Sequence, residues 1–327
     1  MNPLLISSLL LSFLFTLFFT PVWIKRLRKV GLISKDMHKL KGEGVAGVGG
    51  VPVIFGFILG VLAYIAIRTF YFEANGIQEE ILALVSSVLI MGFIGFMDDI
   101  LGWKIGLSIK GRLLLFLFGA IPIMVINAGD STMMGIKFGL IYPLILIPIG
   151  IVGTAATFNF LAGYNGLETG QGIILLSALS FVSWKTGNSW LSIIGLCMVV
   201  SLFAFYIFNK NPAHIFPGNT LTYPLGAMIG ILAIMGDMEK IALFFFIPYI
   251  IEVGLKARGK LKKESFAKLN KDGSLDLPYE KIYGLEHLAI KILKKVKKNG
   301  KVYERDVVYL INGFQVLIVL LGVVIFL

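Results

Sequence analysis

Charged residues and cysteine are both scarce in this chain of 327 residues. Only 15% of the residues are Asp, Glu, Lys or Arg, and the single cysteine, Cys197, lies inside an apolar segment. One thiol forms no disulfide framework and no thiolate metal site, so redox chemistry has no support in the sequence. Soluble proteins carry about 25% charged residues, and the low charge therefore argues against a soluble protein.

Apolar residues take the place of the missing charge. They make up 57% of the chain, and the mean hydropathy is +0.87. A helix needs about 20 mostly apolar residues to cross a bilayer. The sequence predicts an all-α polytopic membrane protein, a single transmembrane domain over 1–327, with about ten spans. They are expected at 3–24, 45–67, 81–97, 112–127, 138–158, 171–184, 188–208, 218–236, 240–255 and 306–327.

The basic residues predict the orientation. All but four of the 30 Lys and Arg residues fall in the loops 25–44, 98–112, 209–217 and 256–305. Because Lys and Arg gather in cytoplasmic loops, we expect these loops, with 159–170, to face the cytoplasm and both termini to lie outside. The chain has a net charge of +11, and its basic residues flank the apolar spans. This position favours anionic membrane lipid or an anionic substrate as the partner, and not nucleic acid.

The first apolar segment and the last hydrophilic loop each carry an expectation. Segment 3–24 lacks a basic leader and an obvious cleavage site, so we interpret it as a retained span rather than a signal peptide. In the loop 256–305, inserted between the last two spans, the turn at 270–273 predicts two short strands. Residues 285–296 predict a basic amphipathic helix, which lies on the membrane surface or packs on the loop's own core.

Two adjacent carboxylates, Asp98 and Asp99, follow the apolar run 85–97. Each is costly near hydrocarbon and the two repel each other, so a metal, a phosphate or a cation is expected beside them. In a phosphoryl-transfer site they could bind Mg²⁺ or accept a proton. Alternatively, one of them forms an ion pair with Lys110 or Arg112 that fixes the loop.

Three further polar clusters fall on the same expected face. The glycine-rich stretch 42–50, after the charged residues 35–39, admits the close approach of a ligand or a neighbouring helix. The amide-rich string 158–168 could bind a uracil edge or a metal, or could supply helix caps and an Asn-Gly turn. The Pro-Gly turn within 211–220 exposes backbone N–H groups, which favour anions.

Taken in order, these clusters resemble those of the polyprenyl-phosphate N-acetylhexosamine-1-phosphate transferases. The match is closest to the eukaryotic and archaeal UDP-GlcNAc:dolichyl-phosphate GlcNAc-1-phosphotransferases. It rests on ten spans, the Asp pair after the third, the string Asn159–Glu168 after the fifth and the Phe-x-Gly-x-Thr turn before the eighth. The loop segment 268–275 also resembles the eukaryotic loop, and the paired histidines of the bacterial cell-wall branch are absent.

The resemblance implies an activity and a set of site residues. The enzyme would transfer GlcNAc 1-phosphate from UDP-GlcNAc to a dolichyl or polyprenyl phosphate and release UMP. This is the first membrane step of lipid-linked glycan (N-glycan) assembly, with Mg²⁺ or alternatively Mn²⁺ as cofactor and a homodimer as the assembly. The implied residues are Asp98, Asp99 and Lys110 for catalysis, Met37, Glu43, Gly163, Asn165, Phe216 and Lys263 for the substrates, and Asn159 and Asn219 for the metal.

Two departures from the family pattern keep alternatives open. Asn219 stands where the family usually has a metal-binding Asp, and an amide supplies less charge to Mg²⁺. Lys263, Glu264 and Ser265 stand where the eukaryotic enzymes have Arg-His-Arg, and lysine lacks the bidentate fork of arginine. The same chemistry with another UDP-aminosugar or a muramyl donor is one alternative. A secondary transporter is another, against which the nearly uncharged mid-span segments and the lack of a repeat argue.

Overall fold

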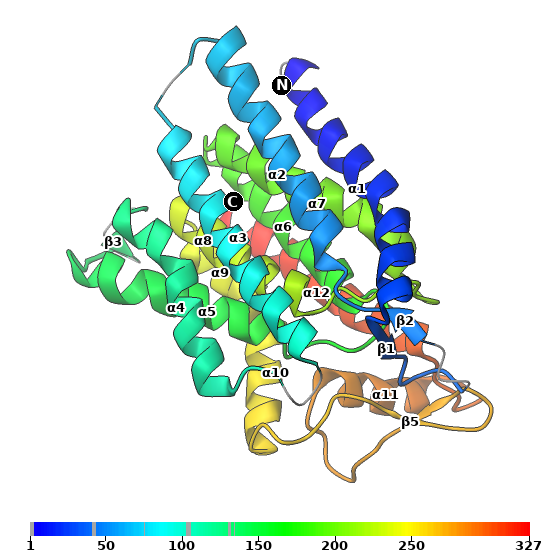
Figure 1. Cartoon of the computed structure of the whole chain (residues 1–327). Helices are drawn as coiled ribbons and strands as arrows, with labels where there is room; N and C mark the ends of the chain where they lie inside the picture. The colour runs from blue at the N-terminus through cyan, green and yellow to red at the C-terminus, as the bar shows by residue number, and fades with distance from the viewer. Residues whose placement is uncertain (1–2, 41–43, 75, 103–105, 130–131, 134) are drawn as a thin grey trace.

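Long apolar helices dominate the computed structural model, which describes residues 3–40, 44–74, 76–102, 106–129, 132–133 and 135–327 (Figure 1). Most of them run side by side as a bundle. In chain order they are α1 (Pro3–Val30), α2 (Gly50–Ala66), α3 (Gln78–Leu101), α4 (Ile109–Val125), α5 (Ile147–Phe158), α6 (Leu167–Lys185), α7 (Ser189–Asn209), α8 (Asn219–Met235), α9 (Glu239–Phe245), α10 (Ile247–Arg258), α11 (Leu285–Val296) and α12 (Glu304–Phe326).

Each of the ten expected segments contains helix. Among the described residues, five helices are long and apolar enough to cross a membrane: α1, α2 with its π-helical extension η1 (Ile67–Tyr71), α3, α7 and α12. Helix α8, and α5 with the π-helical turn η2 (Tyr142–Leu146), are apolar but shorter. The chain is therefore a helical membrane protein, and the number of ten spans stays a prediction.

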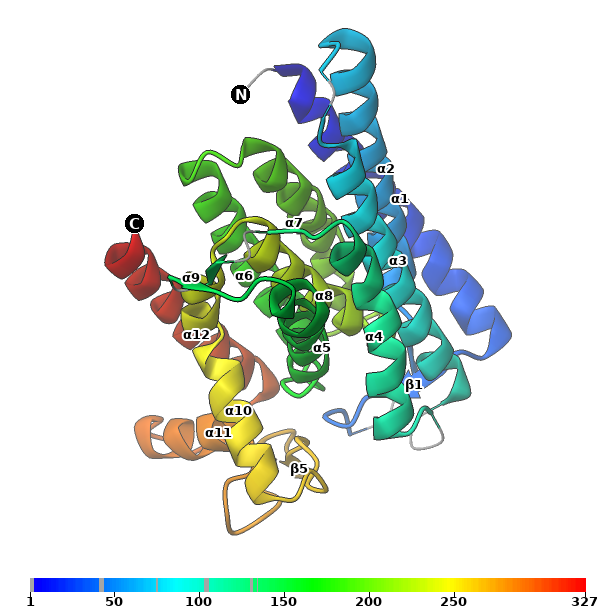
Figure 2. The same ribbon diagram turned by 90° about the vertical axis from the view of Figure 1, so that its left-hand side faces the viewer.

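The ninth expected segment, 240–255, differs from the prediction because it is two helices rather than one. Helix α9 ends at Phe245 and α10 begins at Ile247, with Phe246 between them. Pro248 lies in the first turn of α10, a position where proline's missing N–H leaves no helical hydrogen bond unmade. The break lets α10 extend beyond the bundle toward the last hydrophilic loop (Figure 2).

Helix α8 lies at the centre of the bundle, and every residue from Thr220 to Met235 is buried. Small residues let its neighbours approach closely. A Cβ at Gly95 of α3 would lie 2.1 Å from the carbonyl oxygen of Asn219, and one at Gly226 of α8 would lie 2.5 Å from that of Thr154 in α5. Such contacts are typical of helix packing in membranes. The first contact holds the start of α8 against the C-terminal part of α3, and the second holds the middle of α8 against α5.

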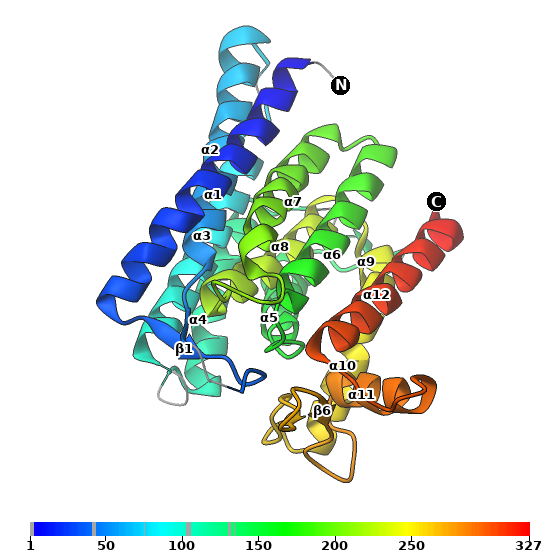
Figure 3. The same cartoon turned by 90° about the vertical axis from the view of Figure 1, so that its right-hand side faces the viewer.

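One end of the bundle collects the loops that carry polar residues. The strands β1 (Ile33–Lys35) and β2 (Gly44–Ala46) pair antiparallel after α1. The N–H of Phe216 donates to the carbonyl of Ala46 at 2.8 Å, and that of Gly49 donates to the carbonyl of Phe216 at 2.9 Å, so the α7–α8 loop lies beside β2. Both chain termini lie away from this end (Figures 1 and 3). A second hairpin, β3 (Thr132–Met133) with β4 (Ile136–Lys137), follows α4.

The loop 256–305 has the elements that its sequence predicts. Strands β5 (Lys268–Leu269) and β6 (Leu275–Asp276) form a hairpin, and α11 follows it below the bundle (Figure 1). Leu285, Ala289 and Ile290 of α11 are buried, whereas Lys291 and Lys295 are exposed. The helix therefore packs on the loop's own core and on the bundle. Lys294 of the same helix forms an ion pair with Asp276 of β6.

Candidate active site

The N-terminus of α8 is where the four polar clusters meet. Asp98 and Asp99, in the last turn of α3, both contact it. Asn159, at the C-terminal end of α5, accepts a hydrogen bond from the Thr222 hydroxyl of α8 at 2.9 Å. The glycine-rich stretch reaches the same place, because a Cβ at Gly50 would lie 2.5 Å from the backbone of Thr220. Residues more than 100 positions apart in the chain thus form one site.

Asp99 caps α8 from a different helix. Its Oδ1 accepts the backbone N–H of Asn219 at 2.8 Å, and its Oδ2 accepts the backbone N–H of Thr220 at 2.9 Å and the Thr220 hydroxyl at 2.7 Å. The residue before α8, Gly218, has no side chain to cap the helix. The first N–H groups of a helix lack partners within it and favour a negative charge. The Asp99 carboxylate supplies both needs.

Asp98 is neutralised by Arg112, as one of the two sequence alternatives proposes. The Arg112 Nη2 lies 3.2 Å from Asp98 Oδ2, which also accepts the Tyr223 hydroxyl at 2.6 Å. Asp98 Oδ1 accepts the backbone N–H of Leu107 at 2.7 Å. Lys110, the other alternative, is exposed and makes no ion pair within the described part of the chain. Its catalytic role stays a prediction.

The two amides expected to hold a metal lie close to the same helix start. The Asn219 Nδ2 donates to Asp98 Oδ2 at 3.0 Å, which leaves its amide oxygen free of that bond. Thr222, which contacts Asn159, is three residues further along α8 and so lies on the same helical face as Asn219. The amide and carboxylate oxygens gathered here are the hard ligands that Mg²⁺ prefers. Since several of them already accept hydrogen bonds, the site fits a cation held largely by substrate phosphates.

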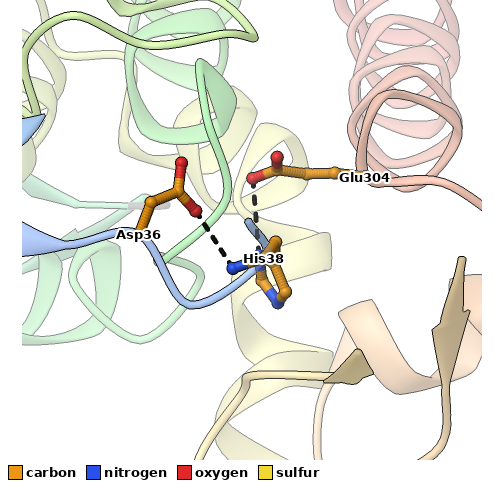
Figure 4. Close-up of side chains that lie close together, drawn as sticks. All are labelled: Asp36, His38 and Glu304. Atoms are coloured by element: carbon orange, nitrogen blue, oxygen red, sulfur yellow. Dashed lines mark hydrogen bonds and ion pairs between the residues drawn. The ribbon is translucent and has the colours of Figure 1, made fainter. Parts of the chain in front are cut away.

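A second buried cluster joins Asp36, His38 and Glu304 (Figure 4). The His38 backbone N–H donates to Asp36 Oδ1 at 3.0 Å, and His38 Nδ1 lies 3.4 Å from Glu304 Oε1. The imidazole ring also packs against Tyr164, with ring centroids 4.4 Å apart. The three side chains come from the loop after α1 and from the first residue of α12.

This cluster holds Asn165, the residue that the resemblance assigns to uracil. The Asn165 backbone N–H donates to Glu304 Oε1 at 2.7 Å, and its Nδ2 donates to Asp36 Oδ2 at 3.1 Å. The Asn211 amide donates to the other oxygen of Glu304. Residues of these types can ligate metals, but here N–H donors occupy both carboxylates and the Lys39 ammonium lies 3.5 Å from Asp36. We interpret the cluster as a hydrogen-bonded latch on the Asn165 loop.

Of the other residues assigned to the substrates, Gly163 lies in the same loop and Met37 lies between Asp36 and His38. Gly163 has a φ of +102°, and a Cβ there would lie 2.9 Å from the Phe266 ring, so only glycine fits without a shift. Its N–H donates to Glu168 Oε1 at 2.8 Å. Met37 is exposed and Phe216 is partly exposed, so both side chains remain accessible to a ligand. Glu43 lies outside the described residues.

A cavity of about 210 Å³ opens beside these residues. Its walls include Asn159, Lys256, Lys263, Ser265 and Phe266. Lys263, which the resemblance assigns to the donor diphosphate, is exposed, and its ammonium lies 4.7 Å from the centre of the Tyr279 ring. The cavity therefore joins the α5–α6 loop, which carries the amide string, to the loop 256–305.

Similarity to known proteins agrees with this arrangement. The profile of glycosyl transferase family 4 matches residues 81–237. The chain is 33% identical to a Sulfolobus acidocaldarius protein over 98% of this chain and 95% of that protein. It is 34% identical to a Saccharolobus solfataricus protein over 98% and 96%. Both are named, provisionally, as UDP-N-acetylglucosamine–dolichyl-phosphate N-acetylglucosaminephosphotransferases.

A more distant relative comes from bacteria. A phospho-N-acetylmuramoyl-pentapeptide-transferase of Halalkalibacterium halodurans is 26% identical over 80% of this chain and 86% of the relative. The family profile spans the Asp pair, the amide string and Asn219, which the structure brings together at the start of α8. The resemblance found in the sequence is thereby confirmed: the chain belongs to the polyprenyl-phosphate N-acetylhexosamine-1-phosphate transferases of glycosyl transferase family 4.

Proposed function

We propose that the protein transfers GlcNAc 1-phosphate from UDP-GlcNAc to a dolichyl or polyprenyl phosphate and releases UMP. The similarity to two archaeal relatives with this named activity, over 98% of the chain, carries the proposal. The geometry supports it, because the Asp pair, the amide string and a cavity lie at one end of an apolar bundle. A lipid substrate keeps its tail in the membrane while its phosphate meets a water-soluble donor at that end.

In the proposed reaction, an oxygen of the lipid phosphate attacks the β-phosphorus of the donor. The bond from that phosphorus to the bridging oxygen breaks, and UMP leaves with the electron pair. Mg²⁺, or Mn²⁺, bound by Asn159, Asn219 and the donor phosphates would supply positive charge to the diphosphate. Asn165, Gly163, Met37, Phe216 and Glu43 would hold the nucleotide.

The charged residues would act by positioning and by charge stabilisation, as in other phosphoryl transfers. Asp98 orients Arg112, which remains partly exposed next to the α8 terminus. Lys110 and Lys263 would contribute further positive charge near the phosphates. In this proposal the main role of Asp99 is to fix the start of α8, which carries Asn219.

The activity is tested by UMP release from the purified protein given UDP-GlcNAc, a polyprenyl phosphate and Mg²⁺. We expect release that needs all three, and EDTA and lipid-free samples are the controls. Release from a muramyl donor but not from UDP-GlcNAc would transfer the assignment to the bacterial type of relative. No release from folded protein with any UDP-aminosugar would contradict the proposal.

We also propose that the active site faces the cytoplasm, that both termini lie outside, and that the assembly is a homodimer. The orientation can be tested with single cysteines, because the native Cys197 is buried. Lys271→Cys in the β5–β6 turn should react with an impermeant maleimide from the cytoplasmic side only. The matched variant Lys185→Cys, at the end of α6, should react from the outside only. The opposite pattern would reverse the topology, and mass photometry in nanodiscs tests the dimer.

A further inference from the structure

Lys256 is a buried lysine in the wall of the cavity. It lies near the end of α10, and its side chain is 10% exposed. Its ammonium donates to the Ser265 hydroxyl and lies 3.5 Å from Glu252 Oε1. An ammonium carries three donors, so Ser265 and Glu252 leave one available. The cavity that Lys256 lines also contains Asn159 and Lys263.

Three titratable side chains surround Lys256: Glu252, Glu286 and His287. Glu252 is fully buried, and its second oxygen accepts the Leu285 N–H at 2.6 Å. Burial, together with the nearby Glu252, raises the pKa of Glu286 well above its ordinary value. Burial and the Lys256 charge lower the pKa of His287 to about 4, so the imidazole is neutral at pH 7. The ion pair of the cluster joins Lys256 to Glu252.

Contacts with Ser265 and Glu252 hold the Lys256 ammonium in the buried cluster, whereas the neighbouring lysine of the loop packs on aromatic rings. Lys263 is exposed and its ammonium rests on the tyrosine rings of Tyr279 and Tyr283, at 4.7 and 5.8 Å from their centres. A buried charge meets less solvent screening and so attracts an anion more strongly than an exposed one does. Lys256 also donates a hydrogen bond to Ser265, which stands where the eukaryotic enzymes have the last arginine of the Arg-His-Arg cluster.

We propose that Lys256 is a phosphate-binding residue that contacts the diphosphate of a nucleoside-diphosphate sugar in this cavity. The inference rests on the proposed function and extends it to a residue outside the resemblance. In this chain Lys256 of α10 supplies the positive charge that binds the diphosphate. Ser265, which accepts a hydrogen bond from the Lys256 ammonium, acts as a positioning residue. The uridine end of the donor, held at Asn165, does not depend on Lys256.

The test measures binding of UDP-GlcNAc, UDP and uridine to the full chain in detergent. Lys256→Met should weaken UDP-GlcNAc and UDP binding by about 10- to 100-fold, the usual effect of losing a charge-assisted hydrogen bond. Uridine binding should stay unchanged. The matched control is Lys262→Met, because Lys262 is exposed and does not line the cavity. Lys256→Arg should retain part of the affinity for UDP. Equal UDP affinity in wild type and Lys256→Met would overturn the inference.

A second variant separates binding from folding. Lys256→Met leaves Glu252 buried without its partner, which is destabilising. Glu252→Gln with Lys256→Met removes both charges, and this folded double variant should still lose UDP affinity; wild-type affinity in it would overturn the inference. If wild type binds no UDP-GlcNAc, the proposed function fails, and pyrophosphate then tests Lys256. Pyrophosphate binding that disappears in the double variant supports the phosphate site, and binding that persists there overturns it.

Discussion

Replacing Asp99 by alanine should destabilise the protein as well as inactivate it. The carboxylate accepts two backbone N–H groups and one hydroxyl at the start of α8, at 2.7–2.9 Å. Loss of an N-cap costs about 0.5–2 kcal/mol, and hydrogen bonds to a charged acceptor contribute about 1.5–3 kcal/mol each. Because water can replace part of these bonds, we expect a net loss of about 3 kcal/mol. For a chain of 327 residues, this corresponds to a fall of roughly 4 °C in the apparent Tm.

The assay follows the apparent Tm in detergent alongside UMP release. Asp99→Asn keeps one acceptor oxygen and should fall between wild type and Asp99→Ala in Tm. Lys110→Ala is the matched control, because its side chain is exposed and its Tm should not change. If Asp99→Ala loses all activity while its Tm equals that of wild type, the capping argument is refuted. Asp99 would then act directly on the reacting groups.

Three further predictions concern the metal, the latch and pH. Asn219→Asp should lower the Mg²⁺ concentration that gives half-maximal UMP release, because a carboxylate attracts Mg²⁺ more strongly than an amide; an unchanged titration would argue against ligation there. Glu304→Gln should raise the KM for UDP-GlcNAc by about 10-fold with a smaller change in kcat, because Asn165 and Asn211 lose a charged acceptor; a kcat effect alone would contradict the latch. The His287 pKa is lowered to about 4 in the folded protein. Between about pH 6.5 and 4 the unfolded chain therefore binds more protons, so wild-type Tm should fall with acidification. His287→Gln should flatten this dependence, and an equally steep profile would refute it.

Local pattern was enough to predict the helices and the loop elements. The apolar run that ends at Asp98, the turn at 270–273 and the helical spacing in 285–296 all depend on nearby residues, and the structure has the corresponding elements. The broken ninth segment was missed. Its apolar pattern continues through Phe246, and Pro248 was the only local sign of a new helix start.

The spacing of residues in the sequence could not predict which basic residue forms the ion pair with Asp98. Lys110 and Arg112 are two residues apart, and on a helix such positions point to nearly opposite faces. Which one reaches Asp98 depends on where α4 begins, at Ile109, and on the loop that brings the Leu107 N–H to the same carboxylate. Only the folded chain decides this in favour of Arg112.

Lys256 and Glu304 were missed for different reasons. Glu252 and Lys256 are four residues apart in an apolar segment, and this spacing, which places both on one helical face, is a signal that could have predicted their salt bridge. Glu304 was not singled out in the sequence. Its partners Asn165 and Asn211 are 139 and 93 positions away, and no local pattern connects them.

The place of Glu304 at the first turn of α12 has a consequence for biosynthesis. The Asn165 loop emerges from the ribosome well before the residue that holds it, and so does Asn211. The hydrogen bonds that hold the Asn165 loop are therefore completed only when α12 has been synthesised and has packed into the bundle. In a nascent chain that lacks this helix, the Asn165 loop has no Glu304 to hold it. If Asn165 binds the nucleotide as proposed, the order of synthesis delays donor binding until the last helix is in place.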